Sequence, residues 1–248
     1  MGKIIQGNFN RTAPGNKTTA IIAAGGKGSR MGLDFNKIFL DVDEKPILAY
    51  TLDVFEFADC IDNVILVCSD NDKPLCEEIV SEFGYTKVTR IVKGGETRQE
   101  SVRNGLAAVP DTTDIVLVHD AARPLVTKEM LKASIDAASK NGAAAVGILP
   151  VDTVKRVQGT TVFETIDRNS LVLIQTPQTF RKDLLVQAHE TAHQNHQLVT
   201  DDCALLELMG HTVTVVPGAK FNIKLTTPED YAMISAYLTC YRKEDEDD

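Results

Sequence analysis

Short apolar runs rich in Val and Ile alternate along most of this chain with longer amphipathic segments. The runs lie at residues 18–24, 63–68, 88–92, 115–119 and 143–149, and the amphipathic segments lie at 47–58, 73–83, 97–108 and 127–140. Several runs are apolar at consecutive positions, which is typical of strands covered on both faces. The alternation predicts an α/β fold with a doubly wound, mostly parallel sheet. Such sheets bind ligands at the carboxyl ends of their strands.

The alternation breaks at residues 152–176. Two β segments flank Gln158-Gly159 there, and this pattern predicts a hairpin arm that protrudes from the sheet. Farther along, the pattern predicts helices at 181–195 and 201–209 and a strand at 212–216. A last helix is predicted to begin at Pro228, with Thr227 as its N-cap.

No repeat or linker divides the chain, so we expect one domain over residues 18–238 that carries the arm at about 152–176. Residues 1–17 are rich in Gly, Asn and Lys and are expected to form a flexible leader or tail. Residues 239–248 are expected to form an acidic C-terminal tail.

Charge and cysteine content argue against several classes of protein. The 248 residues carry a formal net charge of −9, whereas proteins that coat nucleic acid or anionic membranes need a broad basic face. No apolar stretch approaches the roughly 20 residues of a membrane-spanning helix. The five cysteines contain no C-x-x-C pair, so neither a disulfide framework nor a thiolate zinc site is indicated. We expect a cytoplasmic protein with no nucleic-acid or membrane partner, in which any phosphate site is local.

The segment IIAAGGKGSRMG, residues 21–32, places a glycine-rich loop directly after the first predicted strand. Glycines let a backbone approach a ligand closely, and Lys27 and Arg30 indicate that this ligand is anionic. The dinucleotide fingerprint G-x-G-x-x-G is incomplete because Met31 stands at its third glycine, and the P-loop pattern is absent. With Lys37 as a third cation, the loop fits a triphosphate better. An ordinary solvent-exposed turn is the alternative.

Two further segments place polar groups after predicted strands. Asp120 in VHDAARPLV ends an apolar strand, where a carboxylate is well placed to hold Mg²⁺ with phosphate oxygens. The alternative is that Asp120 only caps the turn that follows it, but Arg123 three residues later favours a binding site. In KGGETRQESVRNGL, residues 93–106, Arg98 and Ser101 follow a second Gly-Gly turn whose backbone amides are candidates for binding a base or ribose. An ordinary strand-to-helix junction explains that segment equally well.

The segment HETAH, residues 189–193, matches the zinc-protease pattern H-E-x-x-H. That pattern needs a third ligand, and Val199 stands at the position expected for an extended metzincin site. We interpret the match as accidental and expect these histidines on the hydrated face of a surface helix. No G-x-S-x-G segment or activating cysteine motif indicates a covalent nucleophile.

Seven blocks occur in a fixed order: AAGGKGSRMG…NKIFL, GGETRQESVRNGL, VHDAARPLV, PVDTVKRV, DRNSLVLIQTPQTF, TDDCALLE and NIKLTTPEDY. Together they resemble the 2-C-methyl-D-erythritol 4-phosphate cytidylyltransferase family over about residues 18–238. The resemblance implies a Rossmann-like nucleotidyltransferase that dimerises through its β-arm and that uses Mg²⁺ or another divalent cation. It implies in-line attack of the polyol phosphate on the α-phosphorus of CTP, with release of pyrophosphate. In such chemistry positioning and charge stabilisation matter more than a strong base.

The resemblance also implies roles for individual residues. It assigns catalysis to the cations Arg30, Lys37 and Lys224, and the metal to Asp120. It assigns binding of the polyol phosphate to Arg123, Arg168 and Thr176. Of these, Arg168 and Thr176 lie on or beside the arm and would act across the dimer. It assigns CTP to Ala24, Gly25, Gly26, Lys27, Gly28, Gly95, Glu96, Arg98, Ser101, Asp120 and Ala121.

Two positions depart from the family pattern. Phe221 stands where some members carry an aspartate, which removes a second carboxylate for the metal. Asn36 stands where other members have a proline before Lys37, and we expect this change to loosen the loop.

Three alternatives remain. Ribitol-5-phosphate cytidylyltransferase shares the fold, the CTP chemistry and the QTPQTF block, and a methylene-sized difference gives only about 1–3 kcal/mol of discrimination. The blocks DAARPL, RQESVRNGL and DRN favour the erythritol enzyme.

The interpretation as an NAD-dependent oxidoreductase depends on the incomplete glycine loop alone. Asp53 lies only loosely at the position expected for the acid that binds the ribose. A catalytically inactive nucleotide-binding regulator is disfavoured because the charged residues assigned above to catalysis and the metal are all present.

Overall fold

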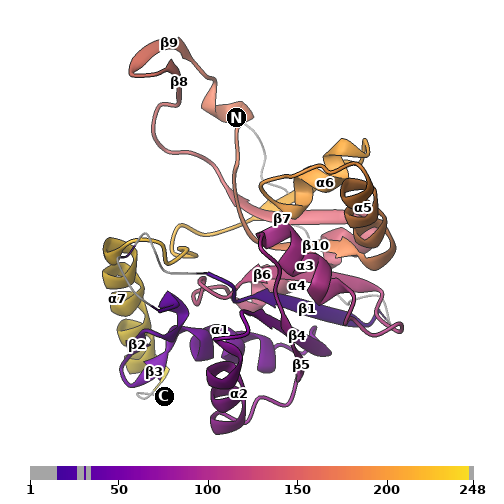
Figure 1. Cartoon of the computed structure of the whole chain (residues 1–248). Coiled ribbons are helices and arrows are strands. Elements are labelled where there is room, and N and C mark those ends of the chain that lie inside the picture. Colours follow the sequence, from indigo (N-terminus) through magenta and orange to yellow (C-terminus); the bar gives the residue numbers. More distant parts are fainter. Residues whose placement is uncertain (1–15, 27–30, 32–34, 246–248) are drawn as a thin grey trace.

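The computed structural model describes residues 16–26, 31 and 35–245. Its centre is a seven-stranded sheet with the order β11-β7-β10-β6-β1-β4-β5 (Figure 1). Neighbouring strands are parallel except in the two pairs that include β10. The strands are β1 (Thr18–Ala23), β4 (Asn63–Cys68), β5 (Val88–Lys93), β6 (Ile115–Asp120), β7 (Ala143–Ile148), β10 (Leu173–Arg181) and β11 (Thr214–Pro217). The predicted α/β fold with a mostly parallel sheet is confirmed.

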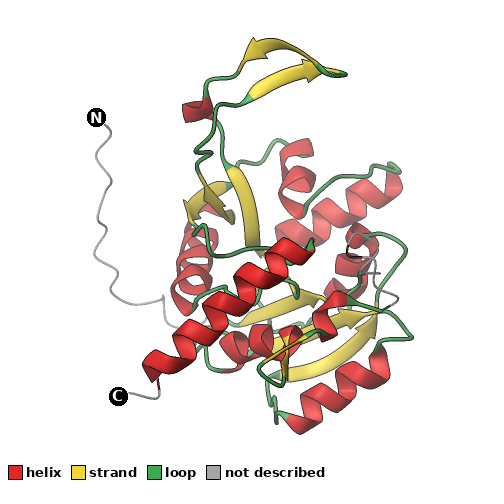
Figure 2. Cartoon of the chain, turned by 90° about the vertical axis from the view of Figure 1, so that its left-hand side faces the viewer, coloured by secondary structure: helices red, strands yellow, loops and turns green. Residues whose placement is uncertain are grey.

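Helices cover both faces of the sheet (Figures 1 and 2). Along β1, Ala20 and Ile22 pack into a core with α1, α2 and α4, whereas Ile21 packs into a second core with α3, α5 and α6. This alternation is expected of a strand buried on both faces, and it confirms the doubly wound arrangement. The helices are α1 (Ile47–Glu56), α2 (Lys73–Glu82), α3 (Arg98–Leu106), α4 (Lys128–Asn141), α5 (Lys182–Gln194), α6 (Asp202–Leu208) and α7 (Pro228–Asp245).

Strand β10 was not predicted. It lies antiparallel between β6 and β7 in the middle of the sheet, although it contains Pro177, and proline cannot donate to a ladder. The register of β10 against β7 shifts between Ile174 and Gln178, so Pro177 lies where the ladder is interrupted. The arm therefore ends before β10 begins at Leu173 and is shorter than the predicted span of 152–176, and Thr176 belongs to the sheet.

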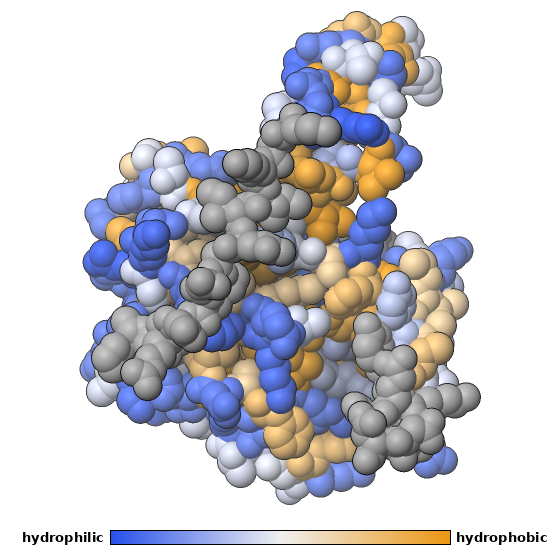
Figure 3. All heavy atoms as spheres, turned by 180° about the vertical axis from the view of Figure 1, so that it is seen from behind, coloured by the Kyte–Doolittle hydropathy of each residue, from blue (hydrophilic) through white to orange (hydrophobic). Residues whose placement is uncertain are grey.

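The protruding arm itself is confirmed. Strands β8 (Lys155–Gln158) and β9 (Thr161–Thr165) form an antiparallel ribbon that stands away from the sheet (Figures 1 and 2). The short helix η3 (Arg168–Ser170) follows β9. Apolar side chains gather on the arm and at its base (Figure 3), among them Val157, Val162 and Phe163, each more than half exposed.

Smaller elements complete the fold. The turn η2 (Lys37–Phe39) and the ribbon of β2 (Asp41–Val42) and β3 (Lys45–Pro46) were not predicted. Thr227 caps α7 as predicted, because its hydroxyl accepts a hydrogen bond from the N–H of Asp230. Helix α7 continues to Asp245, into the predicted acidic tail. None of the helices in the described part of the chain is long and apolar enough to cross a membrane.

Candidate active site

The candidate site lies where the strand order of the sheet reverses. From β1 the chain proceeds to β4 and β5 on one side and then returns to β6 on the other. The carboxyl ends of β1 and β6 therefore flank the switch point at which α/β sheets bind ligands. A pocket of about 870 Å³ lies beside this point, at the carboxyl ends of β1, β4 and β5 and the start of α3. Six predicted nucleotide-binding residues line it: Gly25, Gly26, Gly95, Glu96, Arg98 and Ser101.

Gly25 and Gly26 leave open space beside this pocket. A Cβ atom at Gly25 would lie 4.0 Å from the Ser101 hydroxyl, and one at Gly26 would lie 3.9 Å from the Asn36 side chain. Packing within the described part of the chain therefore does not require glycine at either position. Glycine at both positions leaves room for a ligand to approach the backbone. The predicted anion-binding residues Lys27, Gly28 and Arg30 lie outside the described residues.

Asn36 anchors the end of the glycine loop. Its Nδ2 donates to the carbonyl of Ala24 at 2.7 Å and to the carboxylate of Asp72 at 3.1 Å, and its Oδ1 accepts from the N–H of Ile38 at 3.4 Å. Asn36 is buried; because residues 27–30 and 32–34 of the loop lie outside the described residues, the expectation that Asn36 loosens the loop stays a prediction. The N–H of Ala24 is bonded to β4, so both backbone polar groups of this predicted nucleotide-binding residue are engaged within the chain. The anchor fixes the start of η2, where Lys37 lies.

The loop between β5 and α3 uses its backbone donors internally. Ser101 Oγ accepts from the N–H of Gly95 at 3.1 Å, and the Glu100 carboxylate accepts from the N–H groups of Glu96 at 2.8 Å and Thr97 at 3.3 Å. Thr97 completes a capping box at the start of α3. These amides are therefore not available to a base or ribose in this structure, and the loop lines the pocket with its side chains and carbonyl groups.

Asp120 is the centre of a charged cluster. Lys224 Nζ lies 2.8 Å from Asp120 Oδ2, Arg98 Nε lies 3.4 Å from Oδ1, and Arg123 Nε lies 3.6 Å from Oδ2. Burial raises the pKa of the Asp120 carboxyl, but the charges of Lys224, Arg98 and Arg123 together lower it well below its ordinary value. Asp120 is therefore ionised, and the fold brings together four residues that were predicted from three separate segments.

A second buried carboxylate, Asp202, holds Arg98 from the other side. Arg98 donates to Asp202 at 2.7 Å, and His189 Nε2 lies 3.2 Å from the same carboxylate. The side-chain oxygen of Gln178 accepts from the N–H of Asp202 at 3.1 Å. Burial raises the pKa of Asp202, but the bond to His189 and the charge of Arg98 lower it by more. His189 is buried, so its expected place on a hydrated helix face is wrong.

Sequence reasoning did not assign Asp202 to the site. The available signal was the block TDDCALLE, which carried part of the family resemblance without a role for its acids. The ion pair with Arg98 joins residues that lie 104 positions apart, and no local spacing indicates such a contact.

Two other predicted residues are buried around Asp120, and Arg123 has a further partner there. Thr176 is buried, and its hydroxyl accepts from the N–H of Asp120 at 3.1 Å. Ala121 is buried with its N–H and carbonyl both bonded within the chain. Arg123 donates to the carbonyl of Asn222 at 2.7 Å, which ties the strand end to the segment that carries Lys224.

Two residues near these elements have other surroundings. Phe221 packs its ring against Tyr237 of α7, with centroids 5.9 Å apart, so this position serves packing of the last helix. Arg168 is exposed at the base of the arm, where its guanidinium donates to the carbonyl of Val151. The assignment of Arg168 to the polyol phosphate stays a prediction.

The residues present fit a divalent cation that is shared with a ligand. In the described ranges, no group of three or more His, Cys, Asp or Glu side chains is arranged to hold a metal alone. Asp120 supplies one ionised carboxylate at the strand end. Mg²⁺ is commonly bound by one or two carboxylates together with phosphate oxygens and water. A cation here would therefore need a phosphate ligand to complete its shell.

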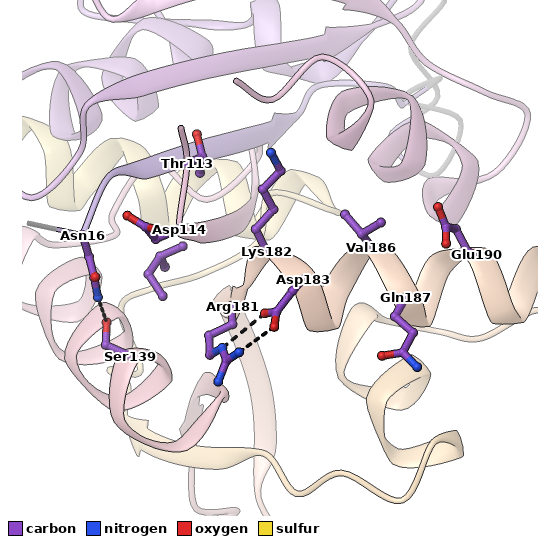
Figure 4. A pocket seen from close by; sticks show the side chains of 11 residues that line it. Asn16, Thr113, Asp114, Ser139, Arg181, Lys182, Asp183, Val186, Gln187 and Glu190 are labelled. Atoms are coloured by element: carbon purple, nitrogen blue, oxygen red, sulfur yellow. Dashed lines mark hydrogen bonds and ion pairs between the residues drawn. The ribbon is translucent and has the colours of Figure 1, made fainter. Parts of the chain in front are cut away.

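A second hollow of about 790 Å³ lies at the opposite end of β6, between α4 and the start of α5 (Figure 4). Asn16 bonds to Ser139 there, and Arg181 pairs with Asp183. Its lining includes Asp114 and Ile115, at the amino end of β6, whereas Asp120 ends the same strand. The hollow therefore takes no part in the charged cluster.

Comparison with known proteins extends the argument beyond geometry. The family model described as 2-C-methyl-D-erythritol 4-phosphate cytidylyltransferase matches residues 18–240. The enzyme of that name from Geotalea uraniireducens is 43% identical over 231 residues, which cover 92% of this chain and 99% of the relative. The one from Alkaliphilus oremlandii is 42% identical over 230 residues, which cover 92% and 98%.

Solved structures agree with these relatives. The crystal structure of 4-diphosphocytidyl-2C-methyl-D-erythritol synthase from Anaerococcus prevotii superposes with a TM-score of 0.80 at 34% identity and covers 90% of this chain and 99% of the other. That of 2-C-methyl-D-erythritol 4-phosphate cytidylyltransferase from Thermus thermophilus gives 0.73 at 27% identity over 88% and 98%. The fold, the charged cluster and these matches lead to one conclusion: this chain is a nucleotidyltransferase enzyme that belongs to the 2-C-methyl-D-erythritol 4-phosphate cytidylyltransferase family.

Proposed function

We propose that the protein transfers the cytidylyl group of CTP to 2-C-methyl-D-erythritol 4-phosphate and releases pyrophosphate. The observation that carries this proposal is the set of three cations around Asp120, beside a pocket whose glycines leave room for a ligand. A triphosphate supplies the negative charge that such a cluster stabilises. The names of the relatives supply the identity of the polyol phosphate.

In the proposed reaction, an oxygen of the polyol phosphate attacks the α-phosphorus of CTP in line. A new P–O bond forms, the bond between the α-phosphorus and its bridging oxygen breaks, and pyrophosphate leaves with the bonding electrons. We assign stabilisation of the charge on the equatorial oxygens to Arg30, Lys37 and Lys224. Catalysis then depends on positioning and on fixed positive charge, and it needs no covalent intermediate.

Asp120 is the residue proposed to hold Mg²⁺ jointly with the triphosphate. The cation would neutralise phosphate charge and orient the leaving group. Lys224, which contacts Asp120 at 2.8 Å, would exchange that contact for phosphate oxygens. Arg98 would stay in place because Asp202 holds it independently.

The arm supports a proposed homodimer. Val157, Val162 and Phe163 are 53%, 55% and 59% exposed on it, and an isolated ribbon with such side chains gains stability by covering them. Arg168 at the base of the arm would then enter the neighbouring site and contact the polyol phosphate. Arg168→Ala is expected to raise the KM for the polyol phosphate, and an unchanged KM would remove Arg168 from that role.

The direct test is pyrophosphate release with CTP and Mg²⁺, with 2-C-methyl-D-erythritol 4-phosphate and D-ribitol 5-phosphate offered in parallel. Strong preference for the first is the expected result. Preference for ribitol phosphate would refute the proposed substrate and retain the CTP chemistry. CTP binding without turnover of either substrate would favour an inactive nucleotide-binding regulator.

A further inference from the structure

His119 is a fully buried histidine for which the proposed reaction has no use. It precedes Asp120 at the end of β6 and has 0% of its surface exposed. Its ring lies against Phe55 of α1, with centroids 5.2 Å apart. Substrates therefore cannot touch it, and any effect of His119 on the reaction must pass through its neighbours.

The hydrogen bonds around His119 define its tautomer. Its Nε2 lies 3.1 Å from the carbonyl oxygen of Arg123, which can only accept, so Nε2 carries a proton. Its Nδ1 lies 3.1 Å from the hydroxyl of Thr176. In a neutral imidazole with its proton on Nε2, Nδ1 can only accept, so the Thr176 hydroxyl donates its proton to Nδ1 while it accepts from the N–H of Asp120 at 3.1 Å. The neutral Nε2–H imidazole satisfies every partner, and the complete burial of the ring favours the same uncharged form.

The hydrogen bonds from the N–H of Asp120 through Thr176 and His119 to the carbonyl of Arg123 form a relay. This relay ties both ends of one turn. The turn runs from Asp120 to Arg123 and is closed by a bond from the N–H of Arg123 to the carbonyl of Asp120. Through Thr176 the relay holds the N–H at the start of the turn, and His119 itself holds the carbonyl at the end. The side chains at these two ends, Asp120 and Arg123, pair with each other in the charged cluster.

We propose that His119, together with Thr176, is a positioning residue that fixes the Asp120–Arg123 turn and so orients both side chains in the charged cluster. This inference rests on the proposed function, which gives those side chains their task. It also gives Thr176 a role different from direct contact with the polyol phosphate. Thr176 is 4% exposed, and its hydroxyl both accepts and donates within the relay.

The unmodified protein provides the first test, because the tautomer is visible without any substitution. Two-dimensional ¹H–¹⁵N NMR of the imidazoles at pH 7 is expected to show His119 with a proton on Nε2 and none on Nδ1. Thr176→Val is expected to shift the Nδ1 resonance, whereas Thr176→Ser is expected to restore it. A proton on Nδ1 in the parent protein would overturn the relay.

Kinetics then separate positioning from direct contact. His119→Asn keeps an acceptor near the position of Nδ1, and His119→Gln keeps a donor near that of Nε2, so each retains one end of the relay. Each is expected to lower kcat about tenfold with both KM values within about twofold, as for loss of one hydrogen bond in the transition state. His193→Gln on the exposed part of α5 is the matched control and is expected to match the parent.

Thr176→Val keeps the inference testable even where a His119 variant fails to fold. Thr176→Val is expected to lower kcat about tenfold, and Thr176→Ser is expected to restore it. The double variant of Thr176→Val and His119→Gln is expected to have a kcat no lower than that of either single variant. An increase confined to the KM for the polyol phosphate would show direct contact and overturn the proposal, as would folded His119 variants with parental kcat. A parent enzyme that releases no pyrophosphate would refute the proposed function first, while the NMR result would still report on the relay.

Discussion

The buried imidazole of His119 makes a quantitative prediction about stability and pH. Burial lowers the pKa of His119 from 6.5 to about 4, and the neighbouring charge of Asp120 offsets only part of this effect. Between these two values the unfolded chain binds a proton that the folded chain does not. The free energy of unfolding must therefore fall as the pH falls from about 6.5 toward 4.

The magnitude follows from the two pKa values. The full difference corresponds to about 3 kcal/mol, of which about 2 kcal/mol is lost between pH 7 and pH 5. Asp120 and Asp202 do not contribute in this window. Their folded pKa values lie below the ordinary 3.8, so the stability that they supply is present above about pH 4 and is lost only at lower pH.

The assay is urea unfolding at pH 7 and pH 5 for the parent, His119→Asn and the surface control His193→Gln. His119→Asn cannot titrate in this range, so its loss of stability between the two pH values should be about 2 kcal/mol smaller than that of the parent. His193→Gln should behave as the parent does. An equal pH dependence in His119→Asn and the parent would refute the assignment of a neutral, buried imidazole.

Three further substitutions test the surroundings of the charged cluster. Asp202→Asn removes a charge that balances Arg98 and is expected to raise the KM for CTP about tenfold. Steady-state kinetics measures this KM, and a value within about twofold of the parent's would contradict the prediction. Asn36→Ala removes three hydrogen bonds at a buried position and should lower the free energy of unfolding by about 1–3 kcal/mol in urea, so an unchanged midpoint would argue against the anchor. Lys224→Met should lower kcat about 100-fold or more, whereas the exposed Lys220→Met should leave it unchanged, and equal losses in the two variants would remove the special role of Lys224.

The parallel part of the fold was predictable because its strands carry local signals. β1, β4, β6 and β7 are short apolar runs that are buried along almost their whole length, and burial on both faces demands that pattern. β10 carries polar residues and a proline in the middle of the sheet. Its Gln175, Thr176 and Gln178 are buried because they bond to other elements. Such partners are distant in sequence, so no period along the strand indicates them.

The site was predictable to the extent that its residues follow strand ends. Gly25, Gly26 and Asp120 lie at carboxyl ends of neighbouring strands, and the topology alone brings them together. His119 and Asp202 were missed for a different reason. Each acts through a hydrogen bond to another side chain or to a backbone group, and a buried histidine in an apolar run is indistinguishable in sequence from a packing residue.

The distribution of charge explains how an acidic protein attracts a triphosphate. The whole chain has a formal net charge of −9, so its long-range field repels polyanions. At the switch point, however, three cations surround Asp120, and the only further carboxylate that pairs with them among the described residues is Asp202. Three positive groups against two negative ones leave a local excess of one positive charge, at partly buried positions where solvent and salt screen it weakly. Affinity for CTP should therefore depend on this cluster rather than on the overall charge, and it should change much less between 50 mM and 300 mM salt than binding of a polyanion to a broad basic surface.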